Sequence, residues 1–242
     1  QEAIELSRAA LARLAASPPD DLVAQAHLLA AAGDAQVAAG RLAAAQALFD
    51  EGLLIAGRTN APGVTFAFLM HLTILHATAG HPEAARAHRA AFEQSYGTST
   101  NLRFVFLCAM LDAHLAIAEG RIGAALAALQ RSIEVGEAVG NPAYQRNARL
   151  LRARLHEDCR QFDAALADAA AAPGIGAASV LLVAEAIRAS AALAAGDAEA
   201  AHQRLRQARA AERIVDDHVH EARDFARCVH AEAMLARGDA AG

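Results

Sequence analysis

A motif that recurs about every 40 residues constrains the fold of this chain more than any other feature of its sequence. In each copy an apolar segment of helical length is followed by a short turn and a second apolar segment. In chain order the turns contain Gly40, Gly80, Gly120, Arg160, Gly196 and Gly238. The first three steps between turns are 40 residues each, and the last two are 36 and 42. Such self-similarity predicts tandem helical hairpins.

The residue types around each turn explain in physical terms why the same pattern recurs. A glycine just past the end of a helix takes the left-handed conformation without a Cβ penalty, and so ends the helix. Five residues after each of the first five turns stands an alanine, namely Ala45, Ala85, Ala125, Ala165 and Ala201. A small side chain at this point allows the two helices of a hairpin to pack closely.

The composition favours an all-α chain. Of the 242 residues 55% are hydrophobic, but only 4% are aromatic and none is Trp. Alanine has the highest intrinsic helix propensity, whereas the aromatic and β-branched residues typical of strands are sparse. All 22 basic residues are Arg, which together with the alanine excess is typical of a GC-rich bacterial genome.

The breakers between apolar segments predict twelve helices. Their expected ranges are about 2–16, 20–39, 42–57, 63–79, 82–96, 101–119, 122–139, 142–159, 162–171, 176–195, 198–214 and 216–237. Repeated hairpins must stack, because one pair alone leaves its apolar face exposed. We therefore expect residues 1–242 to form one domain of about six helix pairs, wound into a right-handed superhelix whose groove is lined by the first helix of each pair. Since both ends fall inside the pattern, the chain is expected to be a piece of a longer protein.

Charge and motifs argue against several classes of function. The net charge of −5 disfavours direct nucleic-acid binding, and no apolar run is long enough to span a membrane. Three widely spaced cysteines, without a visible signal peptide, fit a reducing cytoplasm. The eleven histidines lack metal-ligand spacing. We find no phosphate-binding, hydrolase or metalloprotease motif. We therefore expect no enzyme activity, cofactor or metal.

In this repeat pattern the chain resembles the tetratricopeptide repeat family. Besides the turn glycine and the alanine series, the matching positions are the apolar residue two after the turn and a small residue twelve after it. They are occupied by Leu42, Ile122 and Phe162, and by Gly52, Ser132, Ala172 and Ala208. The sequence departs from the family in its longer period and in lacking an early large aromatic. The proline near the repeat end stands only at Pro62, Pro142 and Pro173.

The long period is similar to that of the sensor region in maltose-activator-type bacterial transcriptional regulators. In that family the repeats lie between a nucleotide-binding and a DNA-binding domain. The resemblance implies a non-enzymatic domain that binds a protein, a peptide or a small ligand, with homo-oligomers allowed. A stand-alone adaptor for protein–protein interaction is the alternative, and a hydrolase or transferase built on helical repeats is a third hypothesis.

One constellation indicates where binding would take place. Arg146, Arg149 and Arg152 lie three residues apart in the predicted helix 142–159, and Asn147 and Arg154 adjoin them. This is the first helix of its pair, so we expect the arginines to line the groove, where guanidinium groups suit a carboxylate, a phosphate or an acidic peptide. The alternative is a solvated face paired with Glu157 and Asp158. By their positions in first helices, Met110, His114 and Ser190 are further groove candidates.

Overall fold

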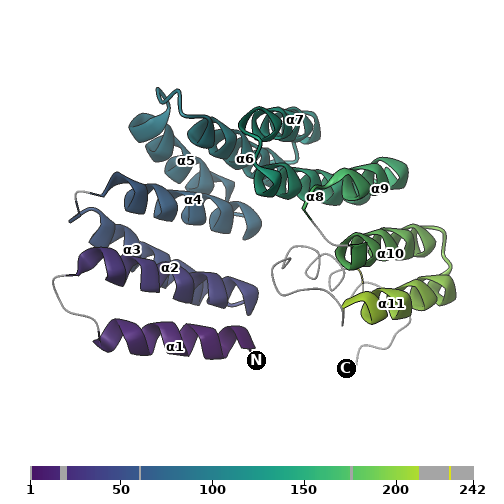
Figure 1. The fold of residues 1–242 in the computed structure, drawn as a ribbon, viewed down its shortest axis with the longest axis horizontal. Coiled ribbons are helices and arrows are strands. Elements are labelled where there is room, and N and C mark those ends of the chain that lie inside the picture. The colour runs from purple at the N-terminus through teal and green to yellow at the C-terminus, as the bar shows by residue number, and fades with distance from the viewer. Residues whose placement is uncertain (1, 17–20, 60, 175–176, 213–228, 230–242) are drawn as a thin grey trace. The chain divides into compact units, whose positions relative to one another are not determined.

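The computed structural model describes residues 2–16, 21–59, 61–174, 177–212 and 229, and throughout that part of the chain the regular structure is helical (Figure 1). The helices are α1 (Glu2–Ala16), α2 (Leu22–Ala38), α3 (Leu42–Ala56), α4 (Pro62–Thr78), α5 (Pro82–Tyr96), α6 (Leu102–Ala118), α7 (Ile122–Val139), α8 (Pro142–Asp158), α9 (Phe162–Ala171), α10 (Ala177–Ala194) and α11 (Ala198–Glu212). This confirms the all-α prediction. The expected helix 216–237 and the turn at Gly238 lie outside the described residues.

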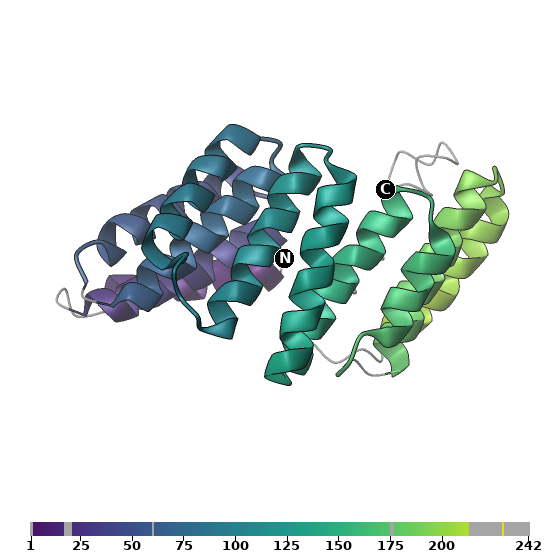
Figure 2. The same cartoon turned by 90° about the horizontal axis from the view of Figure 1, so that it is seen from above.

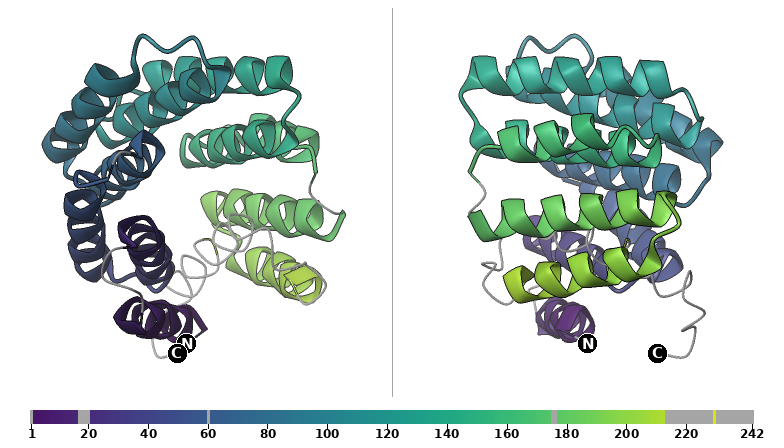
Figure 3. Two further views of the ribbon diagram at one scale, coloured as in Figure 1. Left: turned by 60° about the vertical axis from the view of Figure 1, so that its left-hand side comes forward. Right: turned by 90° about the vertical axis from the view of Figure 1, so that its right-hand side faces the viewer.

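The helices pack as consecutive pairs within two compact units, residues 1–125 and residues 126–242. In the first unit α2 packs on α3 and α4 on α5, while α4 also contacts α6 (Figure 2). In the second unit α8 packs on α9 and α10 on α11, and α9 also contacts α10 (Figure 3). The predicted helical hairpins are therefore present in both units. None of the described helices is long and apolar enough to cross a membrane.

The turns inside the hairpins share one pattern of hydrogen bonds. The N–H of Gly40 donates to the carbonyl of Val37, and the next N–H, of Arg41, donates to Gln36, both at 2.9 Å. The same two bonds recur at Gly80, Gly120, Arg160 and Gly196, and each of these residues has a φ between 59° and 80°. This arrangement satisfies carbonyls that the helix end leaves free. The equal spacing in the sequence thus reflects one repeated helix-ending motif.

Among the residues that the structure describes, Arg160 is the one non-glycine residue with a positive φ, at 59°. A Cβ in this left-handed conformation costs roughly 1–2 kcal/mol, a cost that glycine avoids. Because the Arg160 side chain is exposed, we expect Arg160→Gly to raise the free energy of unfolding by about 0.5–1 kcal/mol. Urea denaturation of the two proteins measures the change. A loss of stability would show that the arginine side chain outweighs the strain of its backbone.

The five alanines predicted at the helix crossings are fully buried. Ala45, Ala85, Ala125, Ala165 and Ala201 each have 0% exposure. The side chains four residues further along each second helix are buried as well, and they are Phe49, Arg89, Leu129, Ala169 and Leu205. The repeat thus places one small and one variable side chain in the core of every hairpin, and the alanine allows the close approach that the sequence predicts.

Gly52, one of the small residues of the repeat, lies against the ring of Phe68. A Cβ on Gly52 would lie 2.2 Å from two ring carbons of Phe68, which is fully buried. We expect Gly52→Ala to lower the free energy of unfolding by roughly 1–3 kcal/mol through overpacking. Gly123 is the matched control, because a Cβ there meets nothing within 4 Å. Gly123→Ala should stabilise α7 by about 0.5–1 kcal/mol. Equal melting shifts in both variants would contradict this account.

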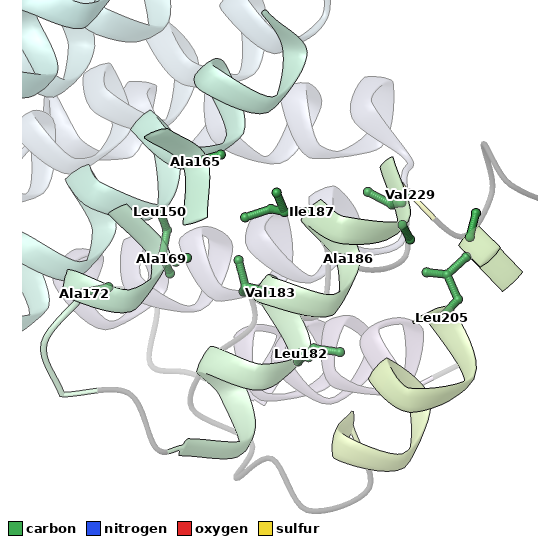
Figure 4. Packing of buried hydrophobic residues seen from close by; sticks show 12 residues of the cluster. Leu150, Ala165, Ala169, Ala172, Leu182, Val183, Ala186, Ile187, Leu205 and Val229 are labelled. Atoms are coloured by element: carbon green, nitrogen blue, oxygen red, sulfur yellow. The ribbon is translucent and has the colours of Figure 1, made fainter. Parts of the chain in front are cut away.

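An apolar core fixes α8, α9 and α10 relative to one another in the second unit. Val183 and Ile187 of α10 are buried with Leu150 of α8 and with Ala165 and Ala169 of α9 (Figure 4). Aliphatic side chains of this kind contribute roughly 1.5–3 kcal/mol each when buried. The core therefore gives the polar side of α8 a rigid support.

Candidate functional site

The start of α8 is defined by local sequence. Gly140, with φ 67°, ends the preceding helix, and the Asn141 side chain accepts hydrogen bonds from the N–H groups of Ala143 (3.0 Å) and Tyr144 (3.4 Å). Pro142 occupies the first helical position, where its missing N–H costs nothing. The register of α8 is thereby fixed, and with it the direction in which its arginines point.

Arg152 forms hydrogen bonds with side chains of two other helices. Its Nε and Nη2 donate to the two carboxylate oxygens of Asp168 on α9, at 2.7 and 2.5 Å, and its Nη1 donates to Gln130 Oε1 at 2.5 Å. Asp168 is buried, with 5% exposure. The hydrogen bonds to Asp168 raise the pKa of Arg152 above its already high ordinary value. This bidentate ion pair therefore holds a permanent positive charge in one position.

Arg149 shares the same carboxylate. Its Nη2 lies 3.1 Å from Glu137 Oε1 on α7, and its Nη1 lies 3.7 Å from Asp168 Oδ1. His156 approaches Asp168 from the next turn of α8, with Nε2 at 3.8 Å from Oδ2. The network thus ties three helices together around one buried acidic side chain.

Arg154 and Ser190 meet at a second carboxylate. Arg154 lies 3.3 Å from Glu157 and 3.1 Å from Asp158, which are the two partners that the solvated-face interpretation of the sequence named. Ser190 of α10 donates a hydrogen bond to the buried Glu157. Ser190 is itself buried. Through Glu157 these residues join α8 to α10.

Arg146 and Asn147 stand apart from both networks. In the described part of the chain no carboxylate forms an ion pair with Arg146, and its Nε is buried without a hydrogen-bond partner. Asn147 Oδ1 is likewise buried and receives no hydrogen bond from a described residue. Both side chains are half-buried on the first turns of α8.

The structure places the other two predicted site residues in the first unit, on α6. Met110 and His114 lie one helical turn apart and are both half-buried. Burial lowers the pKa of His114 to about 4, so the imidazole is neutral at physiological pH. The eight predicted residues therefore form two groups, six in the second unit and two in the first.

The residues of the arginine network that lie on other helices do not appear among the sequence predictions, and neither does His156. Those on other helices are Gln130 and Glu137 of α7 and Asp168 of α9. Asp168 carried a weak signal, because it is the acidic residue next to the buried Ala169 in an otherwise alanine-rich helix. Its partners on α8 depend on how the hairpin closes, which the sequence pattern alone does not define.

Polar clusters also occur in the first unit. His71 lies 3.2 Å from Asp34, and its ring stacks on Phe49 with centroids 4.9 Å apart. Burial raises the pKa of Asp34 and lowers that of His71. Among the described residues no group of three or more His, Cys, Asp or Glu side chains is arranged to hold a metal ion.

Comparison with known proteins places the fold. No family model and no curated protein matches the chain. The solved structure of BtubC (BKLC) from P. vanneervenii is similar to it with a TM-score of 0.55, at 16% sequence identity over 88% of this chain and 89% of that one. A tetratricopeptide repeat protein from Parabacteroides merdae matches at a TM-score of 0.42 and 15% identity, over 94% and 92% of the two chains. The second score is too low to carry an argument. The first shows a shared fold, that of a helical-repeat protein.

Proposed function

We propose that this chain is a non-enzymatic helical-repeat domain that binds a protein, a peptide or a small anionic ligand along α8. The observation that carries the proposal is the row of arginines whose guanidinium groups are held in place by carboxylates. Arg149 and Arg152 are fixed by Asp168, and Arg154 by Glu157 and Asp158. Preorganised donors of this kind lose little entropy when a partner binds.

The chemistry of this surface favours recognition over catalysis. Guanidinium groups donate hydrogen bonds but stay protonated near neutral pH, so they do not act as a general base. Asp168 and Glu157 are engaged in holding arginine and serine side chains, so neither is placed as a free general base. The surface therefore supports binding of an acceptor-rich partner rather than a reaction.

We further propose that the domain is the sensor region of a cytoplasmic bacterial transcriptional regulator. The 40-residue period supports this assignment through its similarity to maltose-activator-type regulators. Binding along α8 would favour one arrangement of the stacked hairpins, and an attached effector domain would respond to that shift. The sequence of the parent gene tests the proposal. A nucleotide-binding domain and a helix-turn-helix domain in the same gene support it, and their absence favours a stand-alone adaptor.

A pulldown tests whether α8 is the binding surface. Arg146 is the residue to reverse, because Arg149 and Arg152 stabilise the fold through Asp168. We expect Arg146→Glu to lose the partners that the unchanged chain recovers. Arg206→Glu is the matched control, since Arg206 is exposed on α11 and carries the same charge. Equal recovery by both variants would exclude the Arg146 end of α8 as the contact surface.

A further inference from the structure

Three histidine side chains meet at the turn end of the α4–α5 hairpin in the first unit. His76 lies buried in the last turn of α4, His81 follows Gly80 in the turn, and His88 is half-buried on α5. The imidazoles of His76 and His88 stack with their centroids 5.3 Å apart and their planes 6° from parallel. The ring of His81 lies 6.3 Å from that of His76. The hairpin thus brings together three groups that titrate near neutral pH.

The stacked pair resists double protonation. Two parallel imidazoles at this distance attract each other when both are neutral. Two imidazolium ions in the same place repel, since a like charge within about 6 Å disfavours the charged form. Burial lowers the pKa of His76 and of His88 from the ordinary 6.5, and the neighbouring His76 lowers the pKa of His88 further. Both rings are therefore neutral above pH 6.5.

Among the described residues, Asp50 of α3 is the carboxylate that acts on this pair. It is exposed and raises the pKa of both imidazoles, but burial outweighs it in each. One carboxylate balances one positive charge, so a second proton on the stack has no counter-charge. The other helices packed against α4 or α5 carry acidic groups that have partners of their own. These are Asp34 of α2, which pairs with His71, and Asp112 and Glu119, in and directly after α6, which pair with Arg89 and Arg86.

Little apolar surface holds the turn end of this hairpin closed. The buried residues there are Ala77, Ala85 and Leu115. Since apolar stabilisation is proportional to the buried area, alanines contribute little of it. The far end of α5 is anchored by Phe92, whose ring packs on Phe66 of α4 with centroids 5.0 Å apart. The turn end is therefore the part of the hairpin that opens locally with the lower free-energy cost.

From these contacts we infer that the His76–His88 stack is a pH switch, which keeps the turn end of the α4–α5 hairpin closed at neutral pH and lets it open in acid. In the open form both imidazoles are hydrated and accept protons that the closed stack resists. The opening equilibrium then shifts by up to about tenfold per pH unit for each extra proton that the open form binds. The switch lies in the first unit and does not depend on the binding proposed for α8.

Hydrogen–deuterium exchange read by mass spectrometry tests the switch. The exchange of backbone amides is followed from about pH 7.5 to about pH 5 and corrected for the intrinsic effect of pH on exchange. We expect the amides beside the Gly80 turn to lose protection about tenfold or more, and those near Phe92 to lose much less. The α10–α11 hairpin, whose turn at Gly196 has the same hydrogen bonds, should keep its protection. Equal losses in both hairpins would mean that acid acts on the whole chain, and would overturn the switch.

Two variants assign the effect to the stacked pair. His88→Phe keeps an aromatic ring against His76 but takes up no proton, so the loss of protection should shrink to about half or less on a logarithmic scale. Asp50→Asn should enlarge the loss, because the closed stack loses the carboxylate that favours its protonated form. His27→Phe, at an exposed position of α2, should behave as the unchanged chain does.

The variants also define what contradicts the switch. A loss in His88→Phe as large as in the unchanged chain, or one in Asp50→Asn that is no larger, would overturn it. Circular dichroism at about pH 7.5, where the hairpin is closed, shows whether each variant is folded. Asp50 is exposed, so Asp50→Asn tests the switch without removing a buried side chain.

Discussion

Replacing Asp168 by alanine is expected to lower the free energy of unfolding by roughly 3–5 kcal/mol. Asp168 is buried and accepts two hydrogen bonds from Arg152, while Arg149 lies within ion-pair distance. Removing the carboxylate leaves the part-buried Arg152 guanidinium without its counter-charge, whereas Arg149 keeps Glu137. Chemical denaturation followed by circular dichroism measures the loss, which is a large share of the stability of a domain of this size.

Asp163→Ala is the control for this experiment. Asp163 lies on the same short helix, α9, but is exposed in its first turn. Its loss removes only a favourable interaction with the helix dipole, worth about 0.3–1 kcal/mol. If Asp168→Ala costs no more than Asp163→Ala, the arginine network does not hold the hairpin together, and the preorganisation on which the binding proposal depends is absent.

The helix boundaries could be predicted because local chemistry repeats. Positive-φ residues at a period near 40 end the first helix of every described hairpin, and the helix expected at 162–171 has those bounds. At α2 the prediction began at residue 20, whereas the helix begins at Leu22. Asp21 instead caps it, by accepting a hydrogen bond from the N–H of Ala24 at 3.0 Å.

The polar contacts were less predictable, because they depend on which side chains meet across helices. Arg89 occupies the position that Phe49 and Leu129 take in neighbouring repeats, and it is buried nonetheless. Its Nε donates to Asp112 on α6 at 2.8 Å, which compensates the buried charge. Likewise the arginine row was visible in the sequence, but its division into held residues and the unpaired Arg146 depends on Asp168 and Glu137. Such partners lie on other helices, at spacings that the repeat does not encode.

Acid is expected to destabilise the chain through His114. Burial lowers its pKa from the ordinary 6.5 to about 4, so the unfolded chain binds more protons than the folded one between these values. The free energy of unfolding therefore rises with pH over this range. Above pH 6.5 His114 is neutral in both states and the folded chain has its full stability, part of which is lost as the pH falls towards 4. The difference in pKa corresponds to roughly 3 kcal/mol at pH 4.

His114→Gln isolates this contribution, because glutamine keeps a polar side chain of similar size but does not titrate. We expect the free energy of unfolding of the unchanged chain to fall more steeply between pH 6.5 and 4, with a gap of roughly 3 kcal/mol opening between the two curves. His76, which is buried, and the half-buried His71 and His88 also have pKa values that burial lowers. They contribute to both curves and cancel in the difference. His27→Gln, at an exposed position of α2, controls for the loss of an imidazole.

Parallel curves for His114→Gln and the unchanged chain would mean that His114 becomes protonated within the folded chain as readily as in the unfolded one. The side chain would then face solvent and could meet a ligand as a cation, whereas a widening gap shows that it meets any partner as a neutral imidazole.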